Sequence, residues 1–249
     1  EIILLGQNVN AYNFKNQRLS DLLYSLSKIK SLERIRYTTS HPKDFTDDLI
    51  EVHAECKKLM PLLHLPVQSG STKILQNMNR NHTIEEYLEI IEKLKVKKSS
   101  IKFSSDFIIA YPGETKDDFE KTVSLMKQVE FINSYSFIFS ARPGTPAANL
   151  KKIDEKIAKE RLAIFQEVAD EVKKKYRKEL VNSTASVLFE NNVRDVNKYF
   201  GRDEYFNSVI VHSNENLAGK IRNVKIDSCN QNTLFGQVIL EDKLKEYAA

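Results

Sequence analysis

Cysteine is scarce in this chain, which has two in 249 residues, Cys56 and Cys229. They lie far apart, with no other Cys or His at metal-site spacing, so the sequence predicts neither a metal centre nor a disulfide framework. It also has no apolar run of the ~18–20 residues that a membrane helix needs. The N-terminus lacks the basic start, apolar stretch and cleavage site of a secretory signal. We therefore expect a cytoplasmic protein with no membrane partner.

Charge of one sign is not in large excess. The formal net charge is +4, with 41% hydrophobic and 29% charged residues, a composition typical of a folded domain. Acidic residues interleave with the lysine clusters at 151–152 and 173–175. This pattern favours a solvated helix face over a dedicated RNA-binding track, although the small excess permits a nucleic-acid partner.

Up to about residue 140, short apolar runs alternate with amphipathic stretches. This alternation is typical of repeated βα units around a parallel sheet. Thr83 with Glu86, and Thr115 with Asp118, have the spacing of capping boxes at two helix starts. We expect strands at residues 2–6, 34–40, 62–68, 103–111 and 134–140.

His53 and Cys56 lie among core positions of an apolar stripe at helical spacing, with Leu49, Val52 and Leu59, so packing is the favoured role of both. A long charged helix is expected over residues 154–180. Beyond it the sequence changes to short β-prone runs separated by Asn, Gly, Asp and Ser, which predict a small β-barrel. The expected domains are therefore residues 1–180 and 181–249, and the expected barrel strands are 185–189, 208–211, 224–226 and 235–240.

The expected parallel strands end in polar residues. Because active sites of parallel barrels form at the carboxyl ends of the strands, these ends predict a site for a ligand with many polar groups. Arg80 could clamp a carboxylate, with a surface ion pair as the alternative. His41 and His82 could transfer protons or be ordinary loop histidines. Glycines 70, 113 and 144 could allow close approach to a ligand or simply form turns.

The strand-end motifs LLGQNVNAY, RYTTSHP, HLPVQSGS, MNRNHT, SSDFIIAYPGET and ARPGTPAA closely resemble those of a known family. It is the methylthiotransferase family of the radical S-adenosylmethionine (SAM) superfamily, and the match is to its MiaB-type, tRNA-modifying members. The later stretches GRDEYFNSVIV and AGKIRNVKIDSCNQNTLFGQVI resemble the TRAM domain of that family, a small β-barrel that holds tRNA.

The resemblance implies an α/β fold, an incomplete radical-SAM (βα)6 partial barrel lacking its first strand, followed by a small all-β TRAM barrel. SAM would lie across the strand ends. Arg80 would pair with its carboxylate and Asp106 with a ribose hydroxyl. The full set of expected cofactor-binding residues is Gln7, Asn8, Ser40, Gln68, Arg80 and Asp106.

The chain also departs from the family pattern. Complete members carry two 4Fe-4S clusters, one on a Cys-x3-Cys-x2-Cys loop and one on a separate N-terminal domain. This sequence has neither cysteine set, and two distant cysteines cannot replace them. Ala110 and Ala141 stand where the family usually has glycine and proline. The methyl group of Ala110 is harmless if its backbone is ordinary strand.

Three functions are compatible with these patterns. The first is a tRNA methylthiotransferase that modifies C2 of an N6-prenylated adenosine beside the anticodon, inactive as this chain alone. The second is a non-catalytic tRNA-binding remnant or a subunit of a split enzyme. The third, an unrelated barrel enzyme such as an aldolase, would need a lysine or a carboxylate pair at the strand ends, and none is evident.

The remaining expectations concern partners. Phosphate contacts with tRNA are expected from Arg202, Lys220, Arg222 and Lys225, with Tyr205 and Phe206 near by for stacking. Ordinary surface charges and core aromatics are the alternative. The apolar edge at residues 2–6 would be unpaired, so we expect aggregation or an upstream chain that supplies the missing strand.

Overall fold

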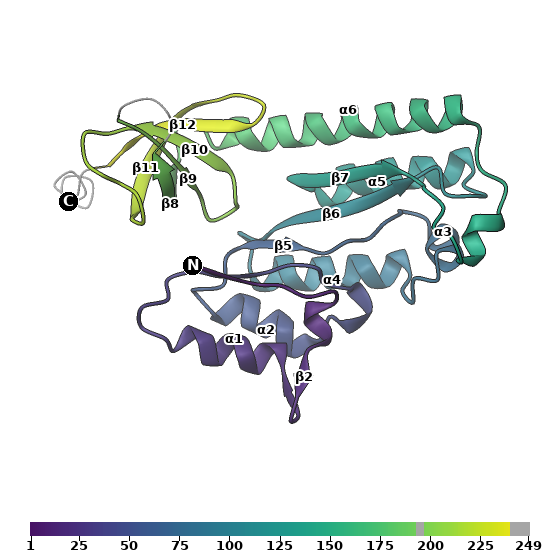
Figure 1. The fold of residues 1–249 in the computed structure, drawn as a ribbon, viewed down its shortest axis with the longest axis horizontal. Coiled ribbons are helices and arrows are strands. Elements are labelled where there is room, and N and C mark those ends of the chain that lie inside the picture. The colour runs from purple at the N-terminus through teal and green to yellow at the C-terminus, as the bar shows by residue number, and fades with distance from the viewer. Residues whose placement is uncertain (193–196, 240–249) are drawn as a thin grey trace. The chain divides into compact units, whose positions relative to one another are not determined.

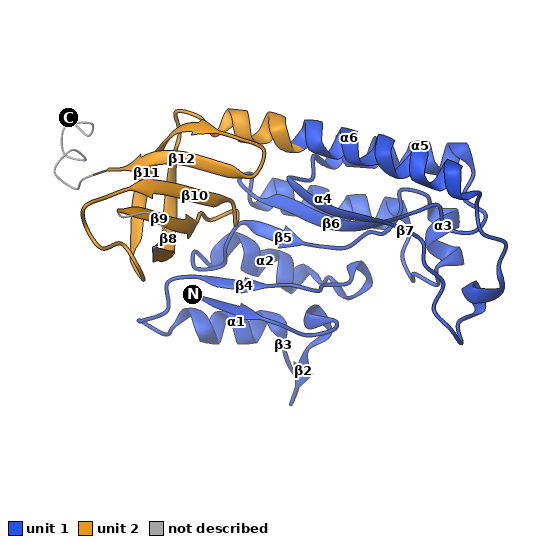
Figure 2. Cartoon of the chain, turned by 45° about the horizontal axis from the view of Figure 1, so that its top comes forward, with its two compact units in different colours: residues 1–172 blue, residues 173–249 orange. Residues whose placement is uncertain are grey.

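The computed structural model describes residues 1–192 and 197–239. The chain forms two compact units, unit 1 (Glu1–Val172) and unit 2 (Lys173–Ala249), coloured separately in Figure 2. They divide within the long helix α6 (Glu155–Glu179), which matches the long helix expected from the sequence. The assignment of domains at residues 180 and 181 stays a prediction.

Unit 1 contains parallel strands in two hydrogen-bonded groups (Figure 1). Ile35 joins the groups, because its N–H donates to the Lys58 carbonyl at 2.8 Å and its own carbonyl accepts from the Met60 N–H at 3.0 Å. The result is an α/β partial barrel, as predicted. The first group is β1 (Ile2–Leu4) with β4 (Ile35–Tyr37), and the second is β5 (Leu62–His64), β6 (Lys102–Ile109) and β7 (Asn133–Ile138).

The helices of unit 1 begin where the sequence places caps. Both predicted capping boxes are present, one at the start of α4 (Ile84–Lys97) and one at the start of α5 (Lys116–Val129). The sequence analysis missed α3 (Thr72–Asn77), a short helix capped by Ser71. It also missed the hairpin of β2 (Asn13–Phe14) and β3 (Gln17–Arg18). The other two helices are α1 (Leu19–Ser27) and α2 (Asp47–Glu55).

The core of unit 1 forms between the strands and the helices. Phe107 of β6 contacts Phe131 and Phe165, with ring centroids 5.4 Å and 4.6 Å away. His53 and Cys56 are both buried in this core, as expected for packing residues. The ring of His53 shares a 2.5 Å hydrogen bond with the Tyr37 hydroxyl, and burial lowers its pKa to about 3. These buried side chains stabilise the core of unit 1 and take no part in the site expected at the carboxyl ends of the strands.

Unit 2 is a closed β-barrel, as predicted. The strand order is β10-β12-β11-β8-β9, and β9 closes the barrel by pairing antiparallel with β10. The analysis of the sequence missed β9. Among the described residues, no helix is long and apolar enough to cross a membrane. The strands are β8 (Thr184–Asn192), β9 (Lys198–Arg202), β10 (Ser208–His212), β11 (Ile221–Cys229) and β12 (Thr233–Val238).

Candidate functional site

Three residues with left-handed backbone follow three strands of unit 1. Thr39 (φ 64°) follows β4, Gln68 (φ 76°) follows β5 and Ala110 (φ 59°) follows β6. An L-residue in this conformation costs roughly 1–2 kcal/mol, and such strained residues cluster at functional sites. The backbone at Ala110 is therefore not ordinary strand. The condition that the sequence analysis set for a harmless methyl group at this position is not met.

Arg80 lies in the loop between α3 and α4, where its backbone N–H donates to the Leu75 carbonyl at 2.8 Å. Within the described residues, its guanidinium makes no hydrogen bond or ion pair, although the residue is partly buried. Burial lowers the pKa of the guanidinium, and the nearby Asp106 carboxylate opposes this effect. Arg80 thus presents an unpaired cation near Asp106, suited to a carboxylate ligand.

His41 and His82 lie beside Arg80. Their rings meet edge to face, with centroids 5.5 Å apart. Burial, reinforced by the charge of Arg80, lowers the pKa of both, and that of His82 falls to about 4. Both imidazoles are therefore neutral at pH 7. His82 can offer one N–H donor and one acceptor to a ligand, whereas His41 already accepts from the Lys43 N–H at Nδ1 and keeps only its Nε2–H.

Two buried side chains in these loops have unsatisfied polar atoms in the part of the chain that the structure describes. His82 is 5% exposed and neither ring nitrogen has a hydrogen-bond partner. Ser40, next to His41, is 6% exposed and its hydroxyl is likewise unpartnered. Buried polar atoms in folded proteins nearly always have partners, so these atoms mark places that a ligand or water satisfies.

Asp106 lies on β6 and its side chain is 33% exposed. Its Oδ2 lies 3.6 Å from Nε2 of His64, a residue of the neighbouring strand β5. The other ring nitrogen of His64 shares a 2.9 Å hydrogen bond with the Ser104 hydroxyl. The carboxylate thus contacts His64 and remains partly exposed, so it can accept hydrogen bonds from a ligand.

The other expected cofactor-binding residues are placed differently. Gln68 is buried, and its backbone pairs with β6 through a 3.0 Å hydrogen bond to the Asp106 carbonyl. Asn8 donates to the Asp44 carboxylate at 2.6 Å and keeps an unsatisfied Oδ1. Gln7 is exposed, and no described contact joins it to Arg80 or Asp106. The charge of Asp106 acts on Arg80, so these two expected residues lie near each other. That Gln7 and Asn8 belong to the same site stays a prediction.

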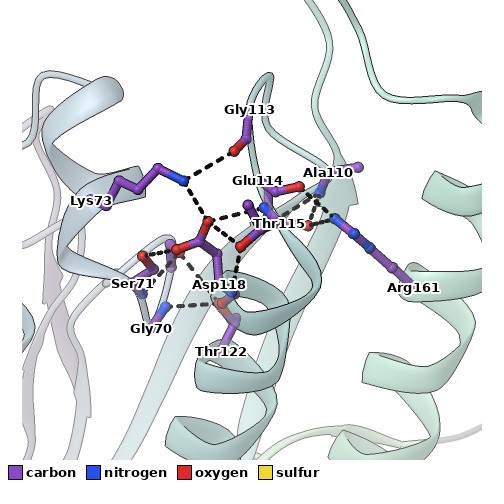
Figure 3. A network of polar contacts seen from close by, with 11 residues as sticks. Gly70, Ser71, Lys73, Ala110, Gly113, Glu114, Thr115, Asp118, Thr122 and Arg161 are labelled. Carbon is purple, nitrogen blue, oxygen red and sulfur yellow. Dashed lines mark hydrogen bonds and ion pairs between the residues drawn. The ribbon is translucent and has the colours of Figure 1, made fainter.

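Gly70 serves the packing of a helix. A Cβ at this position would lie 2.5 Å from the Lys121 carbonyl of α5, and the Gly70 N–H donates to the Thr122 hydroxyl at 2.9 Å. This glycine therefore lets the loop approach helix backbone, not a ligand as the sequence allowed. Figure 3 shows Gly70 within the polar network that joins the start of α3 to α5. Gly113 and Gly144 have φ values of +84° and +81°, as turn glycines do.

A buried ion pair stabilises the turn that follows β6. Glu114, whose side chain is 1% exposed, lies 2.7 Å from the Arg161 guanidinium and accepts from the Ala110 N–H at 3.2 Å (Figure 3). Burial raises the pKa of Glu114, and Arg161 opposes this effect. This pair was not predicted from the sequence, because its partners are far apart in the chain. It holds the left-handed backbone of Ala110 in place.

The expected RNA-binding residues of unit 2 are mostly engaged within the unit. Arg202 pairs with Glu190 at 3.2 Å and stacks on Phe206 at 4.3 Å. Lys220 and Arg222 share the Glu215 carboxylate, at 2.6 Å and 3.0 Å. Lys225 is exposed on β11 and forms no ion pair among the described residues. Exposed pairs are weak enough to exchange for phosphate, so the four stay candidate contacts. Tyr205 packs its ring against Tyr176.

No cluster-binding site forms in the described residues. Cys56 is buried in the core of unit 1, and Cys229 belongs to unit 2. No group of three or more His, Cys, Asp or Glu side chains among the described residues is arranged to hold a metal ion. The residues present therefore do not fit an iron–sulfur cluster, whereas the Arg80 site fits a carboxylate-bearing ligand.

Comparisons with known proteins place this chain in a family. Residues 1–126 match the model of the radical SAM superfamily. Over 249 residues the chain is 57% identical to a tRNA-2-methylthio-N(6)-dimethylallyladenosine synthase of Pelagibacter ubique (strain HTCC1062), with 98% of this chain and 56% of the relative covered. The enzyme of the same name from Rickettsia akari (strain Hartford) is 47% identical, with 96% of this chain and 55% of the relative covered.

The chain spans about half the length of these curated relatives. Among solved structures, it is similar to the radical S-adenosylmethionine methyltransferase TsrM from Kitasatospora setae, with 14% identity and a TM-score of 0.43. That alignment covers 52% of this chain and 26% of TsrM. The chain belongs to the radical SAM superfamily, within which it is similar over nearly its whole length to the MiaB-type tRNA methylthiotransferases.

Proposed function

We propose that this chain is the SAM-binding and tRNA-binding part of a cytoplasmic tRNA methylthiotransferase. The reaction adds a methylthio group to C2 of an N6-prenylated adenosine beside the anticodon. Identity of 57% to a synthase with this product supports the assignment. The single structural observation that carries it is the guanidinium of Arg80, which is unpaired among the described residues and is influenced by the charge of Asp106 on β6.

The residues around Arg80 fit the polar groups of SAM. Arg80 would pair with the carboxylate, and Asp106 would accept from a ribose hydroxyl. The unpartnered Ser40 hydroxyl offers a further hydrogen bond, and Gln68, Gln7 and Asn8 complete the proposed set. When bound next to a reduced cluster, SAM supplies the radical that removes hydrogen from the substrate, and this chain's part is to bind and orient it.

An iron–sulfur cluster does not fit the described residues, so turnover requires thiolates from elsewhere. We propose that an upstream segment or chain carrying cluster ligands packs beside unit 1. The exposed apolar side chains at β1 support this proposal, because Ile3 is 43% and Leu5 is 75% exposed. Without such a segment, the chain binds its ligands as a non-catalytic subunit or remnant does.

Titration calorimetry with SAM tests the proposed site. We expect Arg80→Ala to weaken SAM binding at least about tenfold, because a charge-assisted pair with a carboxylate is lost. Arg18→Ala is the matched control, since Arg18 forms a surface ion pair with Asp48 at 3.3 Å. Equal affinity of the Arg80→Ala variant and the wild-type chain would refute the assignment of this site.

A deoxyadenosine assay tests the proposed division of labour. After anaerobic reconstitution with iron and sulfide, the chain alone should release no 5′-deoxyadenosine from SAM. Co-expression with a fragment that carries the cysteine motifs should restore both the cluster and the product. Turnover by residues 1–249 alone would show that the cluster ligands lie within this chain.

A further inference from the structure

His82 is a buried polar side chain of unit 1 that the proposed site has not yet used. It is 5% exposed, and both ring nitrogens lack partners among the described residues. We propose that the His82 imidazole is a positioning residue that donates its N–H to the carboxylate of the amino-acid portion of SAM, beside Arg80. This inference rests on the proposed function and adds to it a further ligand-binding residue.

The unsatisfied nitrogens are the first reason. A buried donor or acceptor without a partner costs the protein about 1–3 kcal/mol, so natural chains seldom keep one without use. His82 leaves two such atoms in one ring, where an apolar ring of similar size would pack without that cost. Ser40, next to the His41 that contacts His82, leaves another. The loops that carry these orphaned atoms meet where the rings of His41 and His82 touch.

The protonation state of His82 sets what it can donate. Burial, His41 and Arg80 lower its pKa to about 4, while Glu86 acts weakly in the opposite direction. His41 faces the ring edge to face, and Tyr87 lies beside it at 6.4 Å between centroids. The imidazole is therefore neutral at pH 7 and can donate one N–H without adding a second positive charge to the site.

Charge balance favours a carboxylate as the ligand group. Arg80 supplies one positive charge, and the neighbouring Asp106 supplies a negative one. Because these two charges cancel, Asp106 repels a singly charged carboxylate less than it would repel a phosphate dianion. A carboxylate also has about four acceptor positions, of which a two-pronged arginine fills two, leaving room for the His82 N–H and the Ser40 hydroxyl.

The test compares SAM with decarboxylated SAM, which lacks the carboxylate, in titration calorimetry at pH 7. We expect His82→Phe to weaken SAM binding about tenfold and to leave decarboxylated SAM within about twofold of wild type. His82→Gln, whose amide keeps an N–H donor, should recover most of the lost affinity. Ser40→Ala, which leaves the ring in place, should also weaken SAM selectively.

The outcomes separate this inference from the proposed function. If the wild-type chain prefers SAM over decarboxylated SAM and His82→Phe keeps that preference, the role of His82 is refuted and the SAM site stands. If His82→Phe weakens both ligands equally, with Ser40→Ala unchanged, the ring is only structural. If the wild-type chain binds neither ligand, the proposed function falls and the inference falls with it.

Discussion

At the scale of single residues, left-handed backbone occurs in loops that follow the strands of unit 1. Thr39 is exposed and β-branched yet adopts a φ of 64°, a conformation that such residues rarely take. Its carbonyl accepts from the Val9 N–H at 3.0 Å and so fixes the loop after β1. Ala110 repeats the pattern in a buried position. Neither left-handed conformation could be predicted from a short stretch of sequence, because it depends on contacts with neighbouring strands.

Replacement of Thr39 should raise the stability of unit 1. We expect Thr39→Gly to raise the free energy of unfolding by about 1 kcal/mol, because glycine adopts this backbone without strain and the exposed side chain packs little. Urea denaturation followed by circular dichroism measures the change. Thr38→Gly is the control, and it should lower stability by about 0.5–1 kcal/mol because no left-handed backbone is relieved there. A destabilised Thr39→Gly variant would contradict the interpretation.

At the scale of elements, one carboxylate joins two helices. Asp118 of α5 accepts from the Ser71 hydroxyl at 2.7 Å and from Lys73 at 2.9 Å, both near the start of α3 (Figure 3). Burial alone would raise the pKa of Asp118. Hydrogen bonds from Thr115, Ser71 and Lys73 outweigh burial and hold that pKa well below its usual value. The capping box predicted from the sequence is thus also a contact between helices.

Loss of this carboxylate should make unit 1 less stable in a pH-dependent way. Because the pKa is lower in the folded state, the stabilisation is complete above about pH 4 and is lost as the pH falls below that value. We expect Asp118→Asn to lower the free energy of unfolding by about 1–3 kcal/mol at pH 7, and by less at pH 2–3.

Thermal unfolding at a series of pH values measures this difference. Asp117→Asn is the matched control, since Asp117 is 73% exposed and its ion pair among the described residues is with Lys121 of its own helix. Its stability should stay close to that of the wild-type chain at every pH. A constant gap between Asp118→Asn and wild type down to pH 2 would show that the carboxylate's charge is not responsible.

At the scale of the whole molecule, unit 2 is a closed barrel, and its surface lysines and arginines differ in whether an acidic residue already pairs with them. Glu215 engages both Lys220 and Arg222, whereas Lys225 forms no ion pair among the described residues. A cation already paired must give up its partner to reach a phosphate. Lys225 is therefore the expected RNA contact with the least competition from within the protein.

The affinity of the chain for tRNA should fall with salt, and Lys225→Ala should lessen that dependence. We expect the slope of log affinity against log salt to change by about 1, because one phosphate contact is lost. Filter binding at several salt concentrations measures the slope. Lys127→Ala, which removes an exposed lysine of α5, is the control and should leave the slope unchanged. Identical slopes for both variants would exclude Lys225 as a contact.

Most helices and strands of this protein could be predicted from local sequence patterns. Capping boxes and apolar stripes act over a few residues, so the helices α4 and α5, the parallel strands and the change to a β-barrel could all be predicted. The short helix α3, the β2–β3 hairpin and β9 were not predicted from the sequence. The strand-end motifs were likewise sufficient for the superfamily, since they are contiguous stretches.

Which distant residues pair with each other was decided only by the tertiary structure. Arg80 and Arg202 are both arginines beside aromatic or polar residues in the sequence, yet folding leaves one unpaired and sets the other against Glu190. Gly70 similarly faces the backbone of α5, a contact between residues far apart in sequence. Such outcomes depend on which groups meet after folding, because charge pairing and close packing act across space, whereas capping and periodicity act along the chain.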